Sequence, residues 1–232
     1  IAALGGVHPR IIPNNPDGTL LLPLLEHSIR PSDIHNPPTR LICLENTHNF
    51  CQGSPLNPEY MDSVRALAAK YGLKIHLDGA RLFNAAVAQD INVKDLTRQA
   101  DSVMFCLSKG LSAPVGSLVC SNRDFIQRAR KFRKMVGGGM RQAGHLAAAG
   151  LVALENLVER LKEDHQNTQL LAEQLASVEG IELDPAQVKT NIIFFKLKHS
   201  KIDGESFLNL LEENSIKILM TDPGVFRAVL HR

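Results

Sequence analysis

The 232-residue chain has no tryptophan, only two tyrosines and four cysteines, and no excess of either charge. Its 26 basic and 24 acidic residues leave a formal net charge of +2, which gives no reason to expect binding to nucleic acid or to an anionic membrane. The longest apolar stretch, residues 146–154, is too short and too rich in alanine to cross a bilayer. The composition, 44% hydrophobic and 22% charged, is that of a soluble globular protein with one large domain or two smaller ones.

The cysteines and histidines exclude several kinds of site. No two cysteines form a Cys-x-x-Cys pair, and no histidine spacing is typical of metal ligands, so no metal site is predicted. Cys43 and Cys106 lie in apolar, strand-like runs, which predicts buried, reduced thiols and favours a reducing compartment such as the cytoplasm. No signal peptide is recognisable, and because the chain opens on Ile1 rather than methionine we expect a fragment or a processed form.

The most informative segment surrounds Lys109. An apolar run, residues 103–107, leads into a loop of small residues around this lysine, and such a loop lets a large group approach the backbone. A partly desolvated lysine with a lowered pKa is suited to forming an imine with an aldehyde. A second run, residues 74–77, ends at Asp78, with Arg81 three positions further on. A lysine for a Schiff base and a carboxylate for a pyridine nitrogen are the groups that a pyridoxal phosphate enzyme needs.

Each segment alone has an ordinary alternative. Lys109 could be a surface lysine on a glycine-rich turn, and Asp78 could be a carboxylate that simply ends a strand. Their occurrence together, in this order, favours the cofactor site over the two alternatives.

Strand patterns alternate with helix patterns, which is typical of a mostly parallel sheet with ligand sites at the carboxyl ends of its strands. Glu45, Asp78 and Lys109 all fall at such ends. We predict a large α/β domain over residues 1–155 and a smaller α+β domain over 156–232. Strands are expected at 39–45, 73–77, 101–107, 117–120, 191–197, 216–220 and 225–230, and helices at 20–29, 57–72, 122–136, 142–177 with an interruption, and 204–214.

Five segments carry a resemblance to a known family. They are Leu44-Glu-Asn-Thr-His-Asn49, His76-Leu-Asp-Gly-Ala-Arg81, Ser108-Lys-Gly-Leu111, Gly137-Gly-Gly-Met-Arg-Gln-Ala-Gly144 and Phe226-Arg-Ala-Val-Leu-His231. In this order, over essentially the whole chain, they resemble the low-specificity L-threonine aldolases, which are fold-type-I pyridoxal phosphate enzymes. The resemblance implies a large domain like that of the pyridoxal phosphate transferases and retro-aldol cleavage of L-threonine or L-allo-threonine to glycine and acetaldehyde. It also implies a cytoplasmic homo-oligomer, a tetramer in this family.

The resemblance implies a role for each matching residue. Lys109 would carry the Schiff base of the cofactor, and Asp78 would bind the pyridinium nitrogen. Arg81, next to the cofactor, and Arg227 would hold the substrate carboxylate, because guanidinium groups make bidentate, orienting contacts. His48 would be the base near the β-hydroxyl of the substrate.

Two further basic residues match family positions. Lys134 and Arg141 would lie near the cofactor phosphate or at the subunit interface, although both flank a glycine run and could be solvated charges at a helix end.

The other assignments also have alternatives. His48 could cap a helix or hydrogen-bond to a turn, and Arg81 could pair with Asp78 at three-residue spacing. Arg227 could be a solubilising charge on an edge strand.

The chain departs from the family pattern in one respect. Family members carry, ahead of the matching segments, a loop of glycine, serine and threonine that holds the phosphate and a histidine that stacks on the pyridine ring. Neither is found here, so we expect an amino-terminally truncated aldolase that binds pyridoxal phosphate weakly. The alternatives are an impaired or inactive truncated isoform, which acts only in assembly, and another fold-type-I enzyme for glycine- or serine-type substrates.

Lys109 should be the only lysine that reacts with pyridoxal phosphate, because it alone follows a strand pattern into a loop of small residues. Borohydride reduction followed by peptide mapping should find the label on Lys109. A label on Lys131 or Lys134 instead would overturn the assignment.

Overall fold

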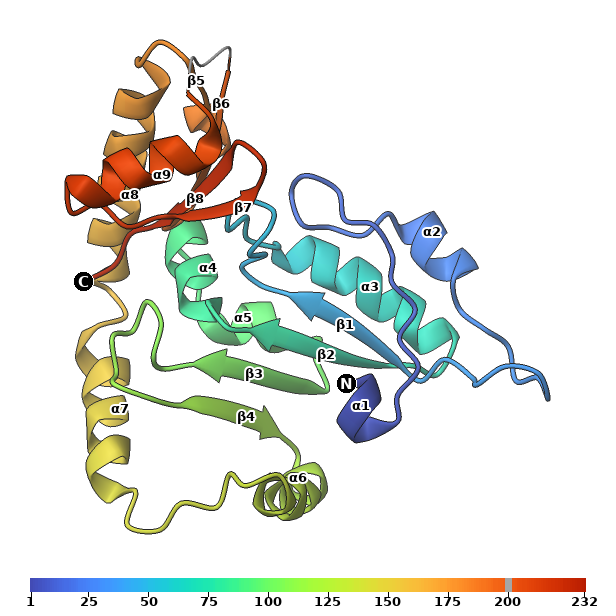
Figure 1. The fold of residues 1–232 in the computed structure, drawn as a ribbon. Coiled ribbons are helices and arrows are strands. Elements are labelled where there is room, and N and C mark those ends of the chain that lie inside the picture. The colour runs from blue at the N-terminus through green and yellow to red at the C-terminus, as the bar shows by residue number, and fades with distance from the viewer. Residues whose placement is uncertain (199–201) are drawn as a thin grey trace.

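The structure, a computed structural model, describes residues 1–198 and 202–232 and contains two separate four-stranded sheets (Figure 1). In the larger sheet the strand order is β1-β2-β3-β4; the first three strands are parallel and the fourth is antiparallel to β3. The expected mostly parallel sheet is therefore confirmed. Its strands are β1 Leu41–Glu45, β2 Lys74–Gly79, β3 Ser102–Cys106 and β4 Ser117–Ser121.

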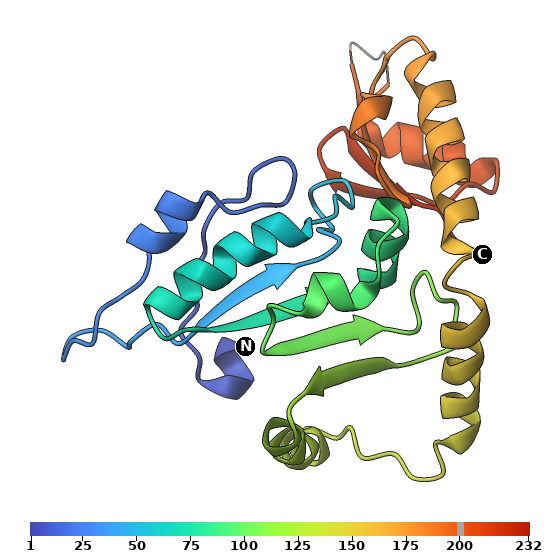
Figure 2. The same ribbon diagram turned by 180° about the vertical axis from the view of Figure 1, so that it is seen from behind.

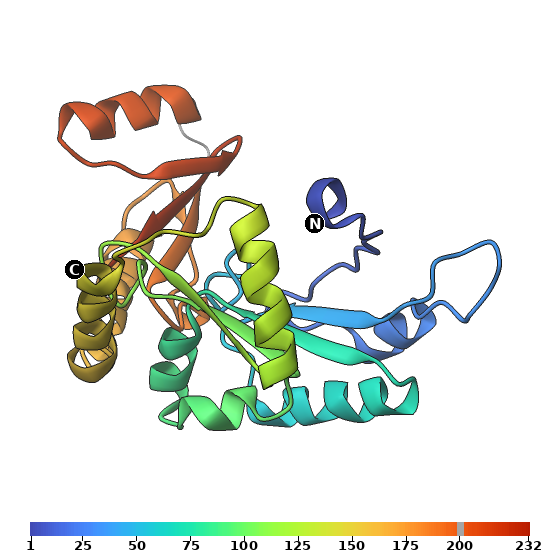
Figure 3. The same ribbon diagram turned by 90° about the horizontal axis from the view of Figure 1, so that it is seen from below.

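Helices cover one face of the large sheet, as Figures 2 and 3 show from two sides. Side chains of β1 and β2 that point to these helices, such as Ile42 and Ile75, are buried and alternate with more exposed residues. Apolar burial on this face drives the packing of helices against sheet. The helices on this face include α3 Pro58–Lys70, α4 Leu82–Gln89 and α5 Val93–Thr97, which follow the short α2 Leu22–His27; α1 Ala2–Gly5 lies on the other side of the sheet in Figure 3.

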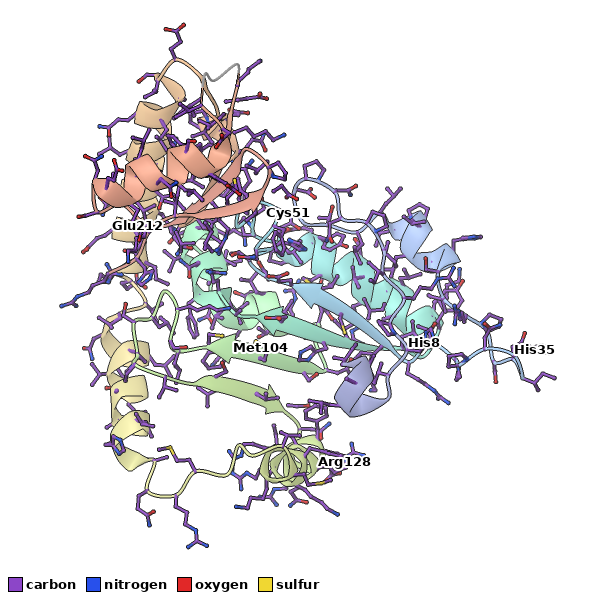
Figure 4. All side chains as sticks on the ribbon, in the orientation of Figure 1. His8, His35, Cys51, Met104, Arg128 and Glu212 are labelled. Carbon is purple, nitrogen blue, oxygen red and sulfur yellow. The ribbon has the colours of Figure 1, made fainter. Side chains whose placement is uncertain are left out.

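The opposite face of the large sheet is largely uncovered by the described residues. Met104, labelled in Figure 4, lies on this face, in register with Asp78. The expectation of buried thiols is wrong. Cys43 is exposed because it alternates onto this open face, and Cys120 is exposed on the edge strand β4; Cys51 and Cys106 are half-buried. An apolar run does not reveal whether both faces of its strand are covered.

Several helices begin or end near their sequence signals. The side chain of Asn57 caps α3 by accepting from the Tyr60 N–H at 2.8 Å, and that of Asn122 caps the next helix, α6, in the same way. The predicted helical stretch 142–177 is divided in two, because the chain leaves the helix between residues 157 and 160. These helices are α6 Arg123–Met135, α7 Gly144–Asn156 and α8 Leu161–Ala176.

The second sheet is antiparallel throughout, in the order β5-β6-β8-β7, and packs against α8 around a core of aromatic rings. The rings of Phe195 and Phe226 stack with their centroids 5.3 Å apart, and Phe207 contributes an edge contact. An α+β terminal unit was expected; its boundary near residue 155 stays a prediction. The elements are β5 Ile181–Glu182, a 3-10 turn η1 Pro185–Gln187, β6 Ile192–Leu197, α9 Gly204–Glu213, β7 Leu219–Asp222 and β8 Val225–Val229.

A small cluster of apolar side chains holds the turn that follows β3. Leu107 and Leu111, on either side of Lys109, are buried against Ala153 of α7 and Leu161 of α8. Gly110 lies so close to α4 and α8 that a Cβ there would be 2.8 Å from Asn84 Oδ1 and 3.0 Å from Leu161 Cδ2. The backbone on both sides of the lysine is therefore fixed by packing.

Asp101 joins α3, β2 and β3 at the beginning of β3. Its carboxylate accepts from Arg65 at 2.8 Å, from the Ile75 N–H at 2.8 Å and from Lys74 at 3.0 Å. Partial burial acts to raise the pKa of Asp101, but these three hydrogen bonds together outweigh it and lower the pKa to about 2.

Asp101→Asn should destabilise the fold in a pH-dependent way. The folded-state pKa of about 2 lies below the ordinary 3.8, so the carboxylate stabilises the fold above about pH 4 and this contribution is lost as the pH falls towards 2. Urea titrations should show a loss of about 2 kcal/mol at pH 7 and a much smaller loss near pH 2. The exposed Asp95→Asn on α5 is the control; an equal loss at both pH values for Asp101→Asn would contradict the assignment.

Gly110→Ala should strain the turn that carries Lys109, because the added methyl group overlaps Asn84 and Leu161. We expect the free energy of unfolding to fall by about 1–3 kcal/mol in denaturant titrations. Gly144→Ala is the matched control, since nothing lies within 4 Å of its Cβ position and it is at the first turn of α7. Equal stability of the two variants would show that the turn is not packed as described.

Candidate active site

The carboxyl ends of β1, β2 and β3 lie at one edge of the large sheet. Glu45 pairs with Asp78 in the parallel register, and the Asn46 N–H donates to the Asp78 carbonyl at 2.8 Å. Cys106 ends the neighbouring strand β3, three residues before Lys109. The loops after these three strands therefore leave the sheet together, which is the usual position of a ligand site in such sheets.

Lys109 is half-buried, in the turn whose flanking leucines are packed against α7 and α8. Among the described residues, no hydrogen bond or ion pair is found for its amine. The carboxylate of Asp78 is also half-buried, and one of its oxygens accepts from the Ala80 N–H at 3.1 Å. This strand-end backbone contact fixes the carboxylate without neutralising it.

Two arginines from distant parts of the chain meet at one amide. Arg81 lies at the N-terminus of α4, and Arg227 lies on β8 of the second sheet. The Oδ1 atom of Asn49 accepts from Arg227 Nη2 at 2.7 Å and from Arg81 Nη1 at 3.4 Å. Because β8 lies between β6 and β7, the alternative of an edge-strand charge for Arg227 is wrong.

The electrostatic surroundings of this arginine pair favour an anion. Burial lowers the pKa of both guanidinium groups, and the positive charge of Arg227 lowers that of Arg81 further. Glu45, Asp78 and Cys106 act in the opposite direction on Arg81, which places it among the three strand ends. Within residues 1–198 and 202–232, neither arginine forms an ion pair, and each has a buried Nε without a hydrogen-bond partner. Such a pair can bind a carboxylate that does not belong to the chain.

His48 follows β1 by three residues and lies in the same region. Its Nε2 atom is 3.7 Å from Glu45 Oε2, and its buried Nδ1 has no hydrogen-bond partner in the described part of the chain. The ring packs on the backbone of Gly18, where a Cβ would come within 2.7 Å of His48 Cβ. The backbone of His48 pairs with Ser54, and α3, the next helix along the chain, is capped by Asn57 instead.

The 46–56 loop, which carries His48 and Asn49, is held at both ends. The amide of Asn46 is fully buried; its Nδ2 donates to the Leu56 carbonyl at 3.2 Å and its Oδ1 accepts from the Leu56 N–H at 3.1 Å. Further along the loop, Thr190 Oγ1 donates to the Gly53 carbonyl at 2.7 Å. Cys51, labelled in Figure 4, marks this loop where it approaches the second sheet.

Lys134 and Arg141 are not brought into contact with the other site residues. Both are exposed: Lys134 is in the last turn of α6, and Arg141 is in the segment between α6 and α7. Figure 1 shows α6 after β4, on the side of the sheet where the parallel strands begin, and Figure 4 labels Arg128 on it. Their proposed contacts with a phosphate or with another subunit stay predictions.

Sequence reasoning missed Asn49 and did not give Glu45 a role beyond its position at a strand end. Both belong to the segment Leu44-Glu-Asn-Thr-His-Asn49, which carries part of the family resemblance, but an asparagine beside a histidine does not by itself indicate a functional role. Asn49 matters because it contacts Arg81 and Arg227, which are 32 and 178 positions away.

No described helix is long and apolar enough to cross a membrane. The described residues contain no group of three histidine, cysteine, aspartate or glutamate side chains that could hold a metal ion.

Sequence comparison identifies close relatives. The low-specificity L-threonine aldolase 1 of Arabidopsis thaliana is 45% identical over 234 residues, which cover 100% of this chain and 65% of the relative. The low specificity L-threonine aldolase of Escherichia coli (strain K12) is 47% identical over 196 residues, covering 84% of this chain and 57% of that protein. The chain thus spans about two thirds or less of the length of these relatives.

Solved structures share the fold. A candidate L-allo-threonine aldolase from Listeria monocytogenes superposes with a TM-score of 0.81 at 18% identity, over 99% of this chain and 63% of that one. The Leishmania major threonine aldolase superposes with a TM-score of 0.71 at 20% identity, over 94% and 63%. The expected fold-type-I architecture is confirmed by these likenesses, and the family model described as Beta-eliminating lyase matches residues 1–198. The chain belongs to the Beta-eliminating lyase family.

Proposed function

We propose that this chain is a pyridoxal phosphate-dependent aldehyde-lyase that cleaves L-threonine to glycine and acetaldehyde. The observation that carries the proposal is the arginine pair on Asn49, which has no carboxylate partner in the described chain and lies at the sheet edge that also bears Lys109 and Asp78. The names of the Arabidopsis and E. coli relatives support the same activity, at 45% and 47% identity.

The residues present fit the cofactor. The half-buried amine of Lys109 has no partner within the described residues, and the carboxylate of Asp78 is held only by a backbone N–H. In the described part of the chain, two buried polar atoms without a hydrogen-bond partner, His48 Nδ1 and Arg81 Nε, belong to residues that follow β1 and β2. Pyridoxal phosphate, when bound, supplies an aldehyde for a lysine amine and a ring that accepts electron density from the substrate.

Each residue then has a defined task. Lys109 binds the cofactor through its amine, and Asp78 holds a proton on the pyridine nitrogen through charge. Arg81 and Arg227 bind the substrate carboxylate and so orient the bond to be broken. His48 accepts the proton of the β-hydroxyl, directly or through water, and Glu45 at 3.7 Å helps to orient its ring.

Several finer assignments belong to the same proposal. The substrates include L-allo-threonine, which the resemblance to the low-specificity L-threonine aldolases implies. Lys134 and Arg141 lie near the cofactor phosphate or at a subunit interface. The protein is a cytoplasmic homo-oligomer, a tetramer by family resemblance. The exposed apolar side chains Phe132, Met135 and Met140, on and just after α6, support such an interface.

A domain division near residue 155 is supported by the end of α7 at Asn156.

Acetaldehyde release from L-threonine in the presence of pyridoxal phosphate tests the proposal. Lys109→Ala should abolish release, and Asp78→Asn should lower turnover roughly 10²–10³-fold with the fold retained, since a neutral amide cannot hold the pyridinium proton by charge. Lys94→Ala and Asp95→Asn, both exposed on α5, are the matched controls and should behave as the parent does. Parent-like turnover in Asp78→Asn, or no release by the parent protein, would refute the proposal.

A further inference from the structure

We propose that Asn49 is the positioning residue of the carboxylate site, holding Arg81 and Arg227 together while leaving their charge free for the ligand. The proposal rests on the function proposed above. It gives a role to Asn49, which is not among the residues assigned there to the substrate carboxylate. The ligand group is a single carboxylate, as in an α-amino acid.

The orientation of the Asn49 amide follows from its neighbours. Both guanidinium groups can only donate hydrogen bonds, so the oxygen end of the amide must face them. It accepts from Arg227 at 2.7 Å and from Arg81 at 3.4 Å. The backbone N–H of Asn49 donates to Glu45 Oε1 at 3.1 Å, which fixes this residue relative to the end of β1. Asn49 is therefore held from two sides, by Glu45 at its backbone N–H and by the arginines at its side-chain oxygen.

The Asn49 side chain must be uncharged to play this role. Two guanidinium groups repel each other, as the lowering of the Arg81 pKa by Arg227 reflects. An acceptor is needed to hold them close, and a carboxylate would be the stronger acceptor. A carboxylate, however, would neutralise one of the two charges and occupy the donors that a substrate carboxylate needs. An amide oxygen brings the pair together and leaves its net charge of about +2 intact.

Asn49 also connects two separate parts of the chain. Arg81 belongs to the large sheet and its helices, and Arg227 belongs to β8 of the second sheet. The 46–56 loop approaches the second sheet through the bond of Thr190 to Gly53, and Asn49 adds the contact that reaches an arginine. The relative position of the two guanidinium groups thus depends on this one side chain.

Calorimetric titration with glycine and with glycinamide, in the presence of pyridoxal phosphate, tests the proposal. The two probes differ in the carboxylate, so a change in the ratio of their affinities between parent and variant reports the carboxylate site. Asn49→Ala should reduce the glycine affinity about 10- to 100-fold and change the glycinamide affinity little, because it releases the pair from a shared acceptor. Asn49→Asp, which keeps the shape of the side chain, should reduce glycine affinity at least as much, because it supplies a competing carboxylate.

The matched control is Asn156→Ala at the end of α7, where an exposed amide bonds only its own helix; it should leave both affinities unchanged. A purely structural role for Asn49 makes a different prediction, since the isosteric Asn49→Asp would then bind glycine like the parent or both probes would weaken together. Either result overturns the proposal, as does a parent protein that does not prefer glycine to glycinamide. If the parent prefers glycine and the variants lose that preference while L-threonine is not cleaved, the proposed activity fails and the role of Asn49 stands.

Discussion

The hydrogen bonds of the 46–56 loop are the constraint on which the candidate site depends. The buried amide of Asn46 bonds both backbone groups of Leu56 and so closes the loop at its base. A buried amide with both ends satisfied is costly to displace, because any movement would leave polar atoms without partners. From this base the loop reaches the second sheet through Gly53 and presents Asn49 to Arg227. The loop thus supplies polar contacts between the two parts of the chain at the site.

The acidic and basic side chains at the strand ends are held by different hydrogen-bond partners. Asp78 accepts from the Ala80 N–H, and Glu45 accepts from the Asn49 N–H, so backbone donors satisfy part of each carboxylate. The arginines are held by an amide instead of by these acids. Positive and negative groups therefore stay close but unpaired, an arrangement that a globular protein seldom keeps unless a ligand completes it.

Patterns that depend on neighbouring residues were predicted well. The Asn57 cap of α3, the strand before Lys109 and the helix from Gly204 all arise from local periodicity and capping. Predictions that required knowledge of packing were weaker. Helices α4 and α5 were not anticipated, β7 begins at Leu219 instead of residue 216, and Cys43 is exposed because one face of its sheet is uncovered. Burial is a property of the assembled layers, so a strand-like run alone cannot specify it.

The sequence by itself determined the chemical groups of the site and their order along the chain. A lysine after one strand and an aspartate at the end of another must share a sheet edge once the strands are parallel, because parallel strands end on the same side. Only the tertiary structure decided that Arg227 meets Arg81, and that Asn49 lies between them. These residues are separated by as many as 178 positions, and no local pattern encodes a contact over that distance. It arises when the packing of two sheets brings a loop and a strand together.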